Sequence, residues 1–185
     1  DVQCGSLHAV VLTNKERLFS TGFGETYALG HGNNHNLNTL KEIVSVTDLV
    51  AERKSSLSKI EVGVTHSGCL LGKRLFVWGM YGSDRSQIAR KPTMLMTNAD
   101  IMDFFMGDML TTMITDAGDV LAIGDNYDDQ LTSDSTGIVK VPIPGKVEVI
   151  AGGLNHTFAI NFKRAKIWAW GSNRLGQICP TSGIQ

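Results

Sequence analysis

The sequence predicts an all-β fold, a portion of a β-propeller with about four blades. Three observations support this prediction. Four similar segments recur along the 185 residues, and each holds two short apolar stretches separated by a polar turn. The chain is 42% hydrophobic with 20 Gly and 4 Pro, which indicates a globular protein rich in turns. All-β repeats of about 40 to 50 residues are typical of propeller blades or of a solenoid.

The four segments keep one register at two landmarks. Each begins with a glycine and carries a second glycine after its second apolar stretch. The first glycines are Gly5, Gly63, Gly107 and Gly153, and the second are Gly22, Gly79, Gly124 and Gly171. Because the two glycines keep nearly the same spacing from each repeat to the next, chance is a poor explanation for the similarity of the segments. We therefore divide a single domain into repeats over residues 2–59, 60–103, 104–148 and 149–185.

Within each repeat the pattern indicates a pair of strands. The apolar stretches are short, rich in β-branched and aromatic residues, and separated by polar turns. They cover residues 9–13 and 18–22, 69–71 and 75–79, 111–115 and 120–124, and 157–161 and 167–171. In the third repeat the turn from Asp116 to Asp119 contains Gly118, which adopts positive φ cheaply. A lone hairpin is marginal in water, so each repeat must bury a face against its neighbours.

The spacer after the first repeat is longer than the others. It includes residues 47–59, TDLVAERKSSLSK, which we expect to form a short helix or a protruding loop. Insertions on one face of a repeat fold often carry function, although a tolerated surface insertion is the plainer alternative. Its candidate partner-binding residues are Asp48, Glu52, Arg53 and Lys54.

An acidic segment, GDNYDDQLTSDS, supplies three more candidates. Asp125, Asp128 and Asp129 lie in it without the alternating acidic positions and terminal Glu of a calcium loop. We interpret the segment as a solvated acidic loop, and its functional alternative is a contact for a basic partner.

Histidine follows the first glycine by three residues in three of the repeats, as His8, His66 and His156. Such residues could converge around an axis as metal ligands. Leu110 takes this place in the third repeat, so a shared set of ligands is incomplete. We expect each histidine instead to order its own blade by hydrogen bonding to neighbouring backbone.

Neither the glycines nor the cysteines predict a cofactor site or a catalytic residue. Gly72-Lys73 lacks the spacing and the following Ser or Thr of a phosphate loop, and there is no Gly-x-Ser-x-Gly nucleophile motif. The cysteines, Cys4, Cys69 and Cys179, lie far apart without metal-ligand spacing. We expect no cofactor, no bound metal and no enzymatic activity.

Charge and hydropathy limit which classes of partner and which cellular compartments the sequence favours. With 17 basic and 18 acidic residues the net charge is −1, which argues against direct binding to nucleic acid. No apolar run approaches the roughly 18 residues of a membrane span. Reduced thiols are the simplest interpretation of three scattered cysteines, so we expect an intracellular protein, cytoplasmic or nuclear. Since the chain begins at the first strand of a repeat, we expect Asp1 to lie within a longer protein.

The residues resemble the regulator of chromosome condensation repeat family. The Gly-x-x-His start, the apolar run ending in Thr or Asn, and the WGSNRLGQ close are similar to its repeats. The fourth repeat is the best match, and the third diverges, with Leu110 in place of His and Asp129 in place of Gly. The family forms a seven-bladed propeller, which four repeats do not close. Further blades in a longer chain, a second chain or copy, and a smaller open arrangement are the alternatives.

The resemblance implies a role in contact with other proteins. We expect a noncatalytic scaffold or adaptor, part of a larger protein or complex, whose partner the sequence does not identify. The alternative is guanine-nucleotide exchange on a small GTPase, implied by the family's founding member acting on Ran, with residues 45–58 as a wedge. The resemblance also implies a third hypothesis, chromatin association, and the net charge near zero argues against it. The role of plant ultraviolet receptors is disfavoured because this chain has only three tryptophans.

Overall fold

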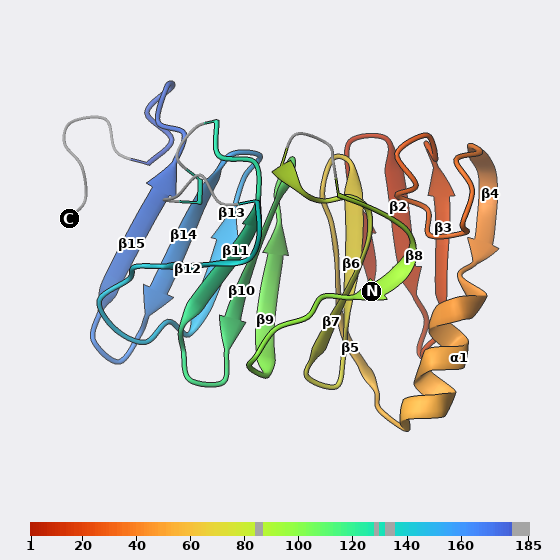
Figure 1. Cartoon of the computed structure of the whole chain (residues 1–185), viewed down its shortest axis with the longest axis horizontal. Helices are drawn as coiled ribbons and strands as arrows, with labels where there is room; N and C mark the ends of the chain where they lie inside the picture. Colours follow the sequence, from red (N-terminus) through yellow and green to blue (C-terminus); the bar gives the residue numbers. More distant parts are fainter. Residues whose placement is uncertain (84–86, 128–129, 132–135, 179–185) are drawn as a thin grey trace.

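The computed structural model describes residues 1–83, 87–127, 130–131 and 136–178. Its strands form four antiparallel sheets, which stand side by side in chain order (Figure 1). Within each sheet the strands follow one another in sequence, so every sheet is a meander. This arrangement confirms the all-β prediction and the partial propeller. The division of the chain at the predicted repeat limits stays a prediction.

The four sheets are named blades 1 to 4. Blade 1 contains β1 (Val2–Cys4), β2 (His8–Leu12), β3 (Leu18–Gly22) and β4 (Leu37–Glu42). Blade 2 contains β5 (Leu57–Val62), β6 (His66–Leu71), β7 (Arg74–Met80) and β8 (Ile88–Met94). Blade 3 contains β9 (Ile101–Met106), β10 (Leu110–Thr115), β11 (Val120–Gly124) and β12 (Val139–Val141). Blade 4 contains three described strands, β13 (Val149–Gly152), β14 (His156–Asn161) and β15 (Lys166–Gly171).

The insertion after blade 1 forms a helix, α1 (Val44–Arg53), at the lower end of the sheets (Figure 1). It begins three residues before the predicted segment and ends where Lys54 adopts φ 49°, and β5 then starts at Leu57. The expectation of one helix or loop over residues 47–59 is therefore wrong in its limits. The helix is not a protrusion, because Val46 is buried and packs in the core between blades 1 and 2.

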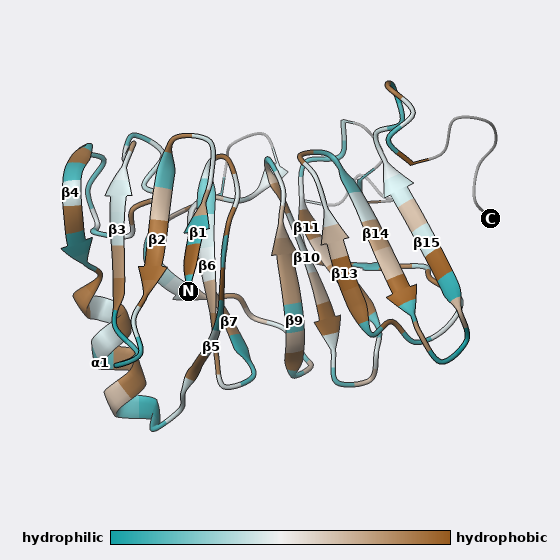
Figure 2. Cartoon of the chain, turned by 180° about the vertical axis from the view of Figure 1, so that it is seen from behind, coloured by the Kyte–Doolittle hydropathy of each residue, from teal (hydrophilic) through white to brown (hydrophobic). Residues whose placement is uncertain are grey.

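The hydrophobic core lies between the blades. Side chains alternate along each strand, so a central strand contributes to two interfaces. In β6, for example, Cys69 packs toward blade 1 and Leu70 packs toward blade 3. The strands are apolar over much of their length, and hydrophilic residues gather at their ends (Figure 2). Each blade therefore depends on its neighbours for the burial that stabilises it.

The first glycine of each repeat lies where successive inner strands approach most closely. A Cβ atom on Gly63 would overlap the carbonyl oxygen of Gly107, and one on Gly107 would overlap that of Leu154. A backbone oxygen cannot turn aside as a flexible side chain can. The close approach of adjacent inner strands explains why these positions of the repeat require glycine.

Candidate functional site

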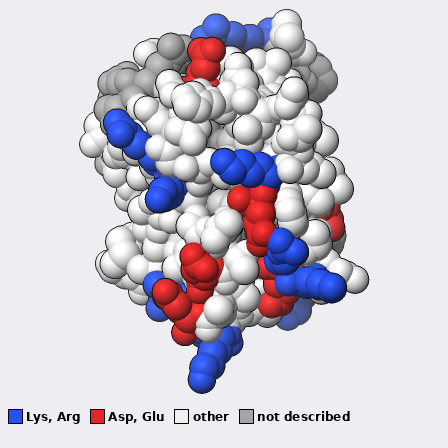
Figure 3. Space-filling view, turned by 90° about the vertical axis from the view of Figure 1, so that its right-hand side faces the viewer, with Lys and Arg blue, Asp and Glu red and all other residues white. Residues whose placement is uncertain are grey.

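The candidate residues of α1 form an exposed, charged surface at the lower end of blade 1. Asp48, Glu52 and Lys54 are exposed. The Arg53 guanidinium lies over the Phe76 ring of β7, 5.4 Å from its centroid, so this residue also ties the helix to blade 2. Figure 3 views the molecule from the side of blade 1, and positive and negative side chains are interleaved over the lower half of that view.

The start of α1 is fixed by a carboxylate from the end of β4. Glu42 forms an ion pair with Arg17 and accepts a hydrogen bond from the Thr47 hydroxyl at 2.9 Å. Hydrogen bonds from Arg17 and then from Thr47 lower the pKa of Glu42 to about 2. Glu42 is therefore ionised at neutral pH, and it holds the first turn of the helix against blade 1.

Asp125 lies at the opposite, upper end of the sheets. It follows β11 directly, and its backbone amide donates to the carbonyl of Met109 at 2.9 Å. Asp128 and Asp129 lie outside the described residues. The structure does not bring Asp125 together with α1, because helix and residue lie at opposite ends of the blades (Figure 1). The predicted partner-binding residues thus belong to two separate surfaces, and their role stays a prediction.

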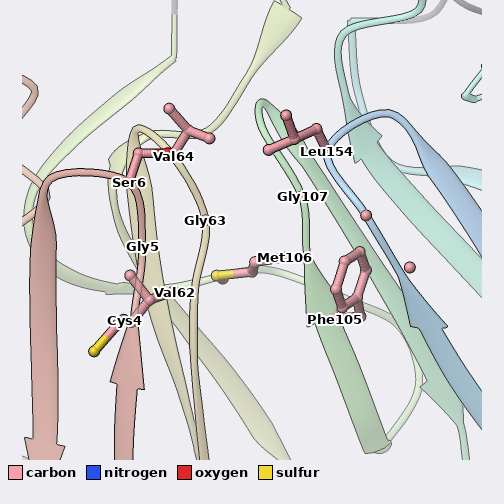
Figure 4. Close-up of a pocket in the computed structure, with 12 residues that line it drawn as sticks. Cys4, Gly5, Ser6, Val62, Gly63, Val64, Phe105, Met106, Gly107 and Leu154 are labelled. Atoms are coloured by element: carbon pink, nitrogen blue, oxygen red, sulfur yellow. The ribbon is translucent and has the colours of Figure 1, made fainter.

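The inner edges of the four blades surround an open hollow of about 330 Å³ (Figure 4). The ends of β1, β5, β9 and β13 line it, and the labelled side chains include Cys4, Met106 and Leu154. None of the described residues that line it is acidic or basic. The hollow is therefore suited to apolar or uncharged groups.

Two other kinds of functional feature are absent from the part of the chain that the structure describes. No three His, Cys, Asp or Glu side chains gather there in a way that could hold a metal ion. In the same part of the chain, no helix has the length and apolarity needed to span a membrane. Of the cysteines, Cys4 is exposed and free, Cys69 is buried and free, and Cys179 lies outside the described residues.

Two of the recurring histidines, His8 and His66, join neighbouring blades. The His8 ring places Nε2 2.8 Å from the Ser67 hydroxyl of blade 2. The Ser67 hydroxyl donates to the carbonyl of Ala28 at 3.0 Å, so the proton between His8 and Ser67 belongs to Nε2. The Ala28 carbonyl also accepts from Trp78 Nε1 at 2.8 Å. One buried network thus connects blade 1 to blade 2.

The second interface repeats this contact, and the third lacks it. His66 Nε2 lies 2.9 Å from the Thr111 hydroxyl of blade 3. Leu110 holds the histidine position in blade 3, and the buried Thr157 hydroxyl of blade 4 has no hydrogen-bond partner among the described residues. The prediction that each histidine orders its own blade through neighbouring backbone is therefore wrong for His8 and His66. These two rings reach side-chain hydroxyls on the following blade.

This difference between interfaces makes a matched pair of substitutions informative. Thr111→Val should lower the free energy of unfolding by about 1–3 kcal/mol, because it leaves His66 Nε2 buried without its partner. Thr157→Val replaces a hydroxyl that has no partner with a methyl group of similar size, so stability should stay the same or rise. Urea unfolding followed by circular dichroism measures both. Equal losses from the two variants would contradict the assignment of the hydrogen bond.

Comparisons with known proteins show which proteins this chain resembles. No protein-family model matches the chain. It is 26% identical over 174 residues to the human E3 ubiquitin-protein ligase HERC2, an alignment covering 86% of this chain and 4% of HERC2. It is 24% identical over 192 residues to the ultraviolet-B receptor UVR8 of Arabidopsis thaliana, covering 96% of this chain and 42% of UVR8.

Solved structures agree with these relatives. Prp20p of Saccharomyces cerevisiae, which is yeast RCC1, matches with a TM-score of 0.84 at 21% identity, over 98% of this chain and 46% of Prp20p. The four blades have the fold of repeats of the regulator of chromosome condensation type. Human WBSCR16 matches with a TM-score of 0.76 at 20% identity, over 94% of this chain and 47% of WBSCR16. At these identities the solved structures show the shared fold, and the chain spans less than half the length of each of these proteins.

Proposed function

We propose that this chain is a noncatalytic protein-interaction portion of a regulator of chromosome condensation type propeller, acting as a scaffold or adaptor for an intracellular protein partner. One observation carries the proposal. α1 is an addition to the repeat pattern that is anchored from within by Val46 and by the Glu42 contacts, while Asp48, Glu52 and Lys54 project from it. A fixed helix with an exposed charged side is suited to recognising another protein surface.

The relatives support this proposal in general terms. The structure of Prp20p was described with its binding to Gsp1p and histones, and yeast RCC1 was solved bound to Kap60. Only 4% of HERC2 aligns with this chain, so the match concerns a small portion of that ligase. One protein with blades of this type, Prp20p, therefore binds several other proteins.

The two acidic residues of α1 favour a partner with basic side chains opposite them. Asp48 and Glu52 are four residues apart, so they lie on the same side of the helix. Across an interface, complementary charges speed association and fix orientation more than they raise affinity. Asp125, at the other end of the blades, offers a second and separate contact of the same sign.

A photo-crosslinking amino acid at Ala51, an exposed residue of α1, tests the proposed surface. The same group at Ala117, an exposed residue of the hairpin in blade 3, serves as the positional control. We expect a protein partner to crosslink from position 51 and not from position 117. A crosslinked partner found equally at both positions, or at neither, would count against α1 as the contact.

Charge reversal on α1 gives the corresponding affinity measurement. The double variant Asp48→Lys/Glu52→Lys should weaken binding of the crosslinked partner about tenfold or more, equivalent to about 1.4 kcal/mol. The double variant Glu25→Lys/Asp116→Lys changes the net charge by the same amount away from α1, and should bind nearly as the unchanged chain does. Equal losses in both variants would show a general charge effect in place of a local contact.

Nucleotide exchange on a small GTPase is the second candidate function, and the likeness to Prp20p is the observation that favours it. Of the predicted wedge, residues 45–53 belong to α1, which packs against blades 1 and 2, and β5 begins at Leu57. Only the connection from Lys54 to Ser56 therefore lies outside the helix and the strand. The test is release of labelled guanine nucleotide from a panel of small GTPases. Unchanged release rates would remove exchange activity and leave the adaptor proposal intact.

A further inference from the structure

The connection between α1 and β5 carries a charge pattern that one class of protein kinases selects. Arg53 and Lys54 precede Ser56 by three and two residues, and Leu57 follows it. Basic-directed kinases choose substrates by charge, because acidic pockets bind two cationic side chains ahead of the acceptor hydroxyl and an apolar pocket takes the residue after it. The sequence of this connection therefore matches a phosphate-accepting segment.

The structure distinguishes Ser56 from the two serines beside it. Ser56 is exposed, and none of the described residues forms a hydrogen bond with its hydroxyl. Ser55 is half-buried, and its hydroxyl donates to the carbonyl of Arg53 at 3.2 Å. The Ser58 hydroxyl, within β5, donates to the carbonyl of Leu70 at 3.4 Å. Ser56 is therefore the accessible acceptor of this segment.

The charge pattern occurs once more in the sequence, and there it lies within a strand. Arg90 and Lys91 precede Thr93 by three and two residues, and all three belong to β8. The Thr93 hydroxyl donates to the carbonyl of Lys91 at 2.8 Å, and Thr93 pairs with Val77 of β7. No other adjacent basic pair in the sequence has Ser or Thr at this spacing. Of the two matches, the one at Ser56 lies outside the sheets and has the free hydroxyl.

The backbone around Ser56 must open locally before it enters a kinase. The amide of Gly72 donates to the Ser56 carbonyl at 2.9 Å. Arg53 ends α1 with its guanidinium over the Phe76 ring, and Leu57 begins β5 and is 7% exposed. A kinase cleft takes its substrate extended, so Arg53 and Leu57 leave these contacts first. Helix ends and connections open more readily than core strands, so this step does not require the blades to unfold.

We propose that Ser56 is phosphorylated by a basic-directed serine/threonine protein kinase that uses ATP. In the transfer, Ser56 Oγ forms a bond to the γ-phosphorus of ATP, and the bond from that phosphorus to the oxygen bridging it to the β-phosphorus breaks. ADP leaves, and the hydroxyl proton passes to a carboxylate of the kinase. The product carries a charge of about −1.5 to −2 next to the carboxyl-terminal end of α1. The modification does not depend on the scaffold role, because it needs only the kinase and this segment.

Phosphorylation of the whole folded chain tests the proposal. The probe is the catalytic subunit of cyclic-AMP-dependent protein kinase, a basic-directed enzyme, with labelled ATP and Mg²⁺, and mass spectrometry maps the modified residue. We expect incorporation of about one phosphoryl group per chain, at Ser56. Ser56→Ala should remove most of the incorporation, whereas Ser55→Ala and Thr93→Ala should retain it.

The preceding charge gives a second readout. Lys54→Gln should lower kcat/KM for phosphorylation about tenfold, because it removes one of the two cations that the acidic pockets bind. Lys73→Gln removes an exposed cation from the turn between β6 and β7, and should leave kcat/KM within about twofold. Circular dichroism at the reaction temperature checks that each variant is folded. The proposal is overturned if the folded chain takes up no phosphate, if the label maps to Ser55 or Thr93, or if the two lysine variants lower kcat/KM equally.

Discussion

Lowering the pH from 7 to 4 should cost the fold on the order of 3 kcal/mol for each of two buried histidines. Burial lowers the pKa of His8 to about 4, against an ordinary value of 6.5. Burial also lowers the pKa of His66 to about 4, the nearby His8 lowers it further, and the backbone of Asp108 partly opposes both. Each ring is thus held neutral within its blade interface.

The direction of the effect follows from proton binding. Between pH 6.5 and 4 the unfolded chain binds protons that the folded chain does not, so stability falls as the pH falls through this range. Above the unfolded pKa the contribution of both histidines is fully present. Glu42, with its pKa lowered to about 2, loses its contribution only below its ordinary pKa of 4.5. The stability that the two histidines contribute is therefore lost at higher pH than the stability that Glu42 contributes.

Urea unfolding at pH 7, 6, 5 and 4 measures this loss. His8→Gln should flatten the dependence because one of the two titrating groups is removed, whereas His35→Gln, a substitution of an exposed histidine, should leave the curve as it is. Stability that stays constant between pH 7 and 5 would mean that the rings accept protons without leaving their interfaces.

The central strands of each blade were predictable because their own residues encode them. The stretches at β2, β3, β10 and β11 are apolar and bounded by turn residues, and the structure places strands there within one residue of the prediction. The outer strands carry no such signal. β4, LNTLKE, is mostly exposed, and β8 contains Pro92, so their strand conformation comes from pairing with β3 and β7. Proline is acceptable there because β8 is an edge strand.

The contacts between blades were harder to predict, because their partners are remote in sequence. His8 and Ser67 are 59 residues apart, and His66 and Thr111 are 45 apart. One signal was present in the repeats, since the residue after the histidine position is Ser67, Thr111 or Thr157 in all but the first. A hydroxyl at one place in successive repeats indicates a partner at the same height on the preceding blade.

Replacing Trp78 by alanine should lower the free energy of unfolding by about 3–5 kcal/mol. Trp78 is fully buried between blades 1 and 2, and its indole Nε1 donates to the Ala28 carbonyl at 2.8 Å. The loop after β3 closes over the ring so tightly that a Cβ on Gly30 would lie 3.0 Å from Trp78 Cδ1. The surrounding backbone cannot collapse into the space, so a cavity would remain.

Two further substitutions separate the ring's volume from its hydrogen bond. Trp78→Phe keeps most of the volume and should cost only about 1–2 kcal/mol, because the Ala28 carbonyl retains its bond from Ser67. Trp170→Ala removes a partly buried indole that donates to the Gln130 carbonyl at 2.9 Å, and should cost less than Trp78→Ala. Urea unfolding gives the three values.

Because Trp78 joins two blades, its loss should also uncouple them. Hydrogen exchange in β2 and β3 should then become faster than in β10 and β11, since blade 1 would open without the rest of the chain. If Trp78→Ala costs no more than Trp170→Ala, or if exchange rises equally in blades 1 and 3, the interface between blades 1 and 2 does not contribute the stability that its burial implies. A large loss of hydrogen-exchange protection confined to blade 1 would show that each interface separately holds one blade to its neighbour.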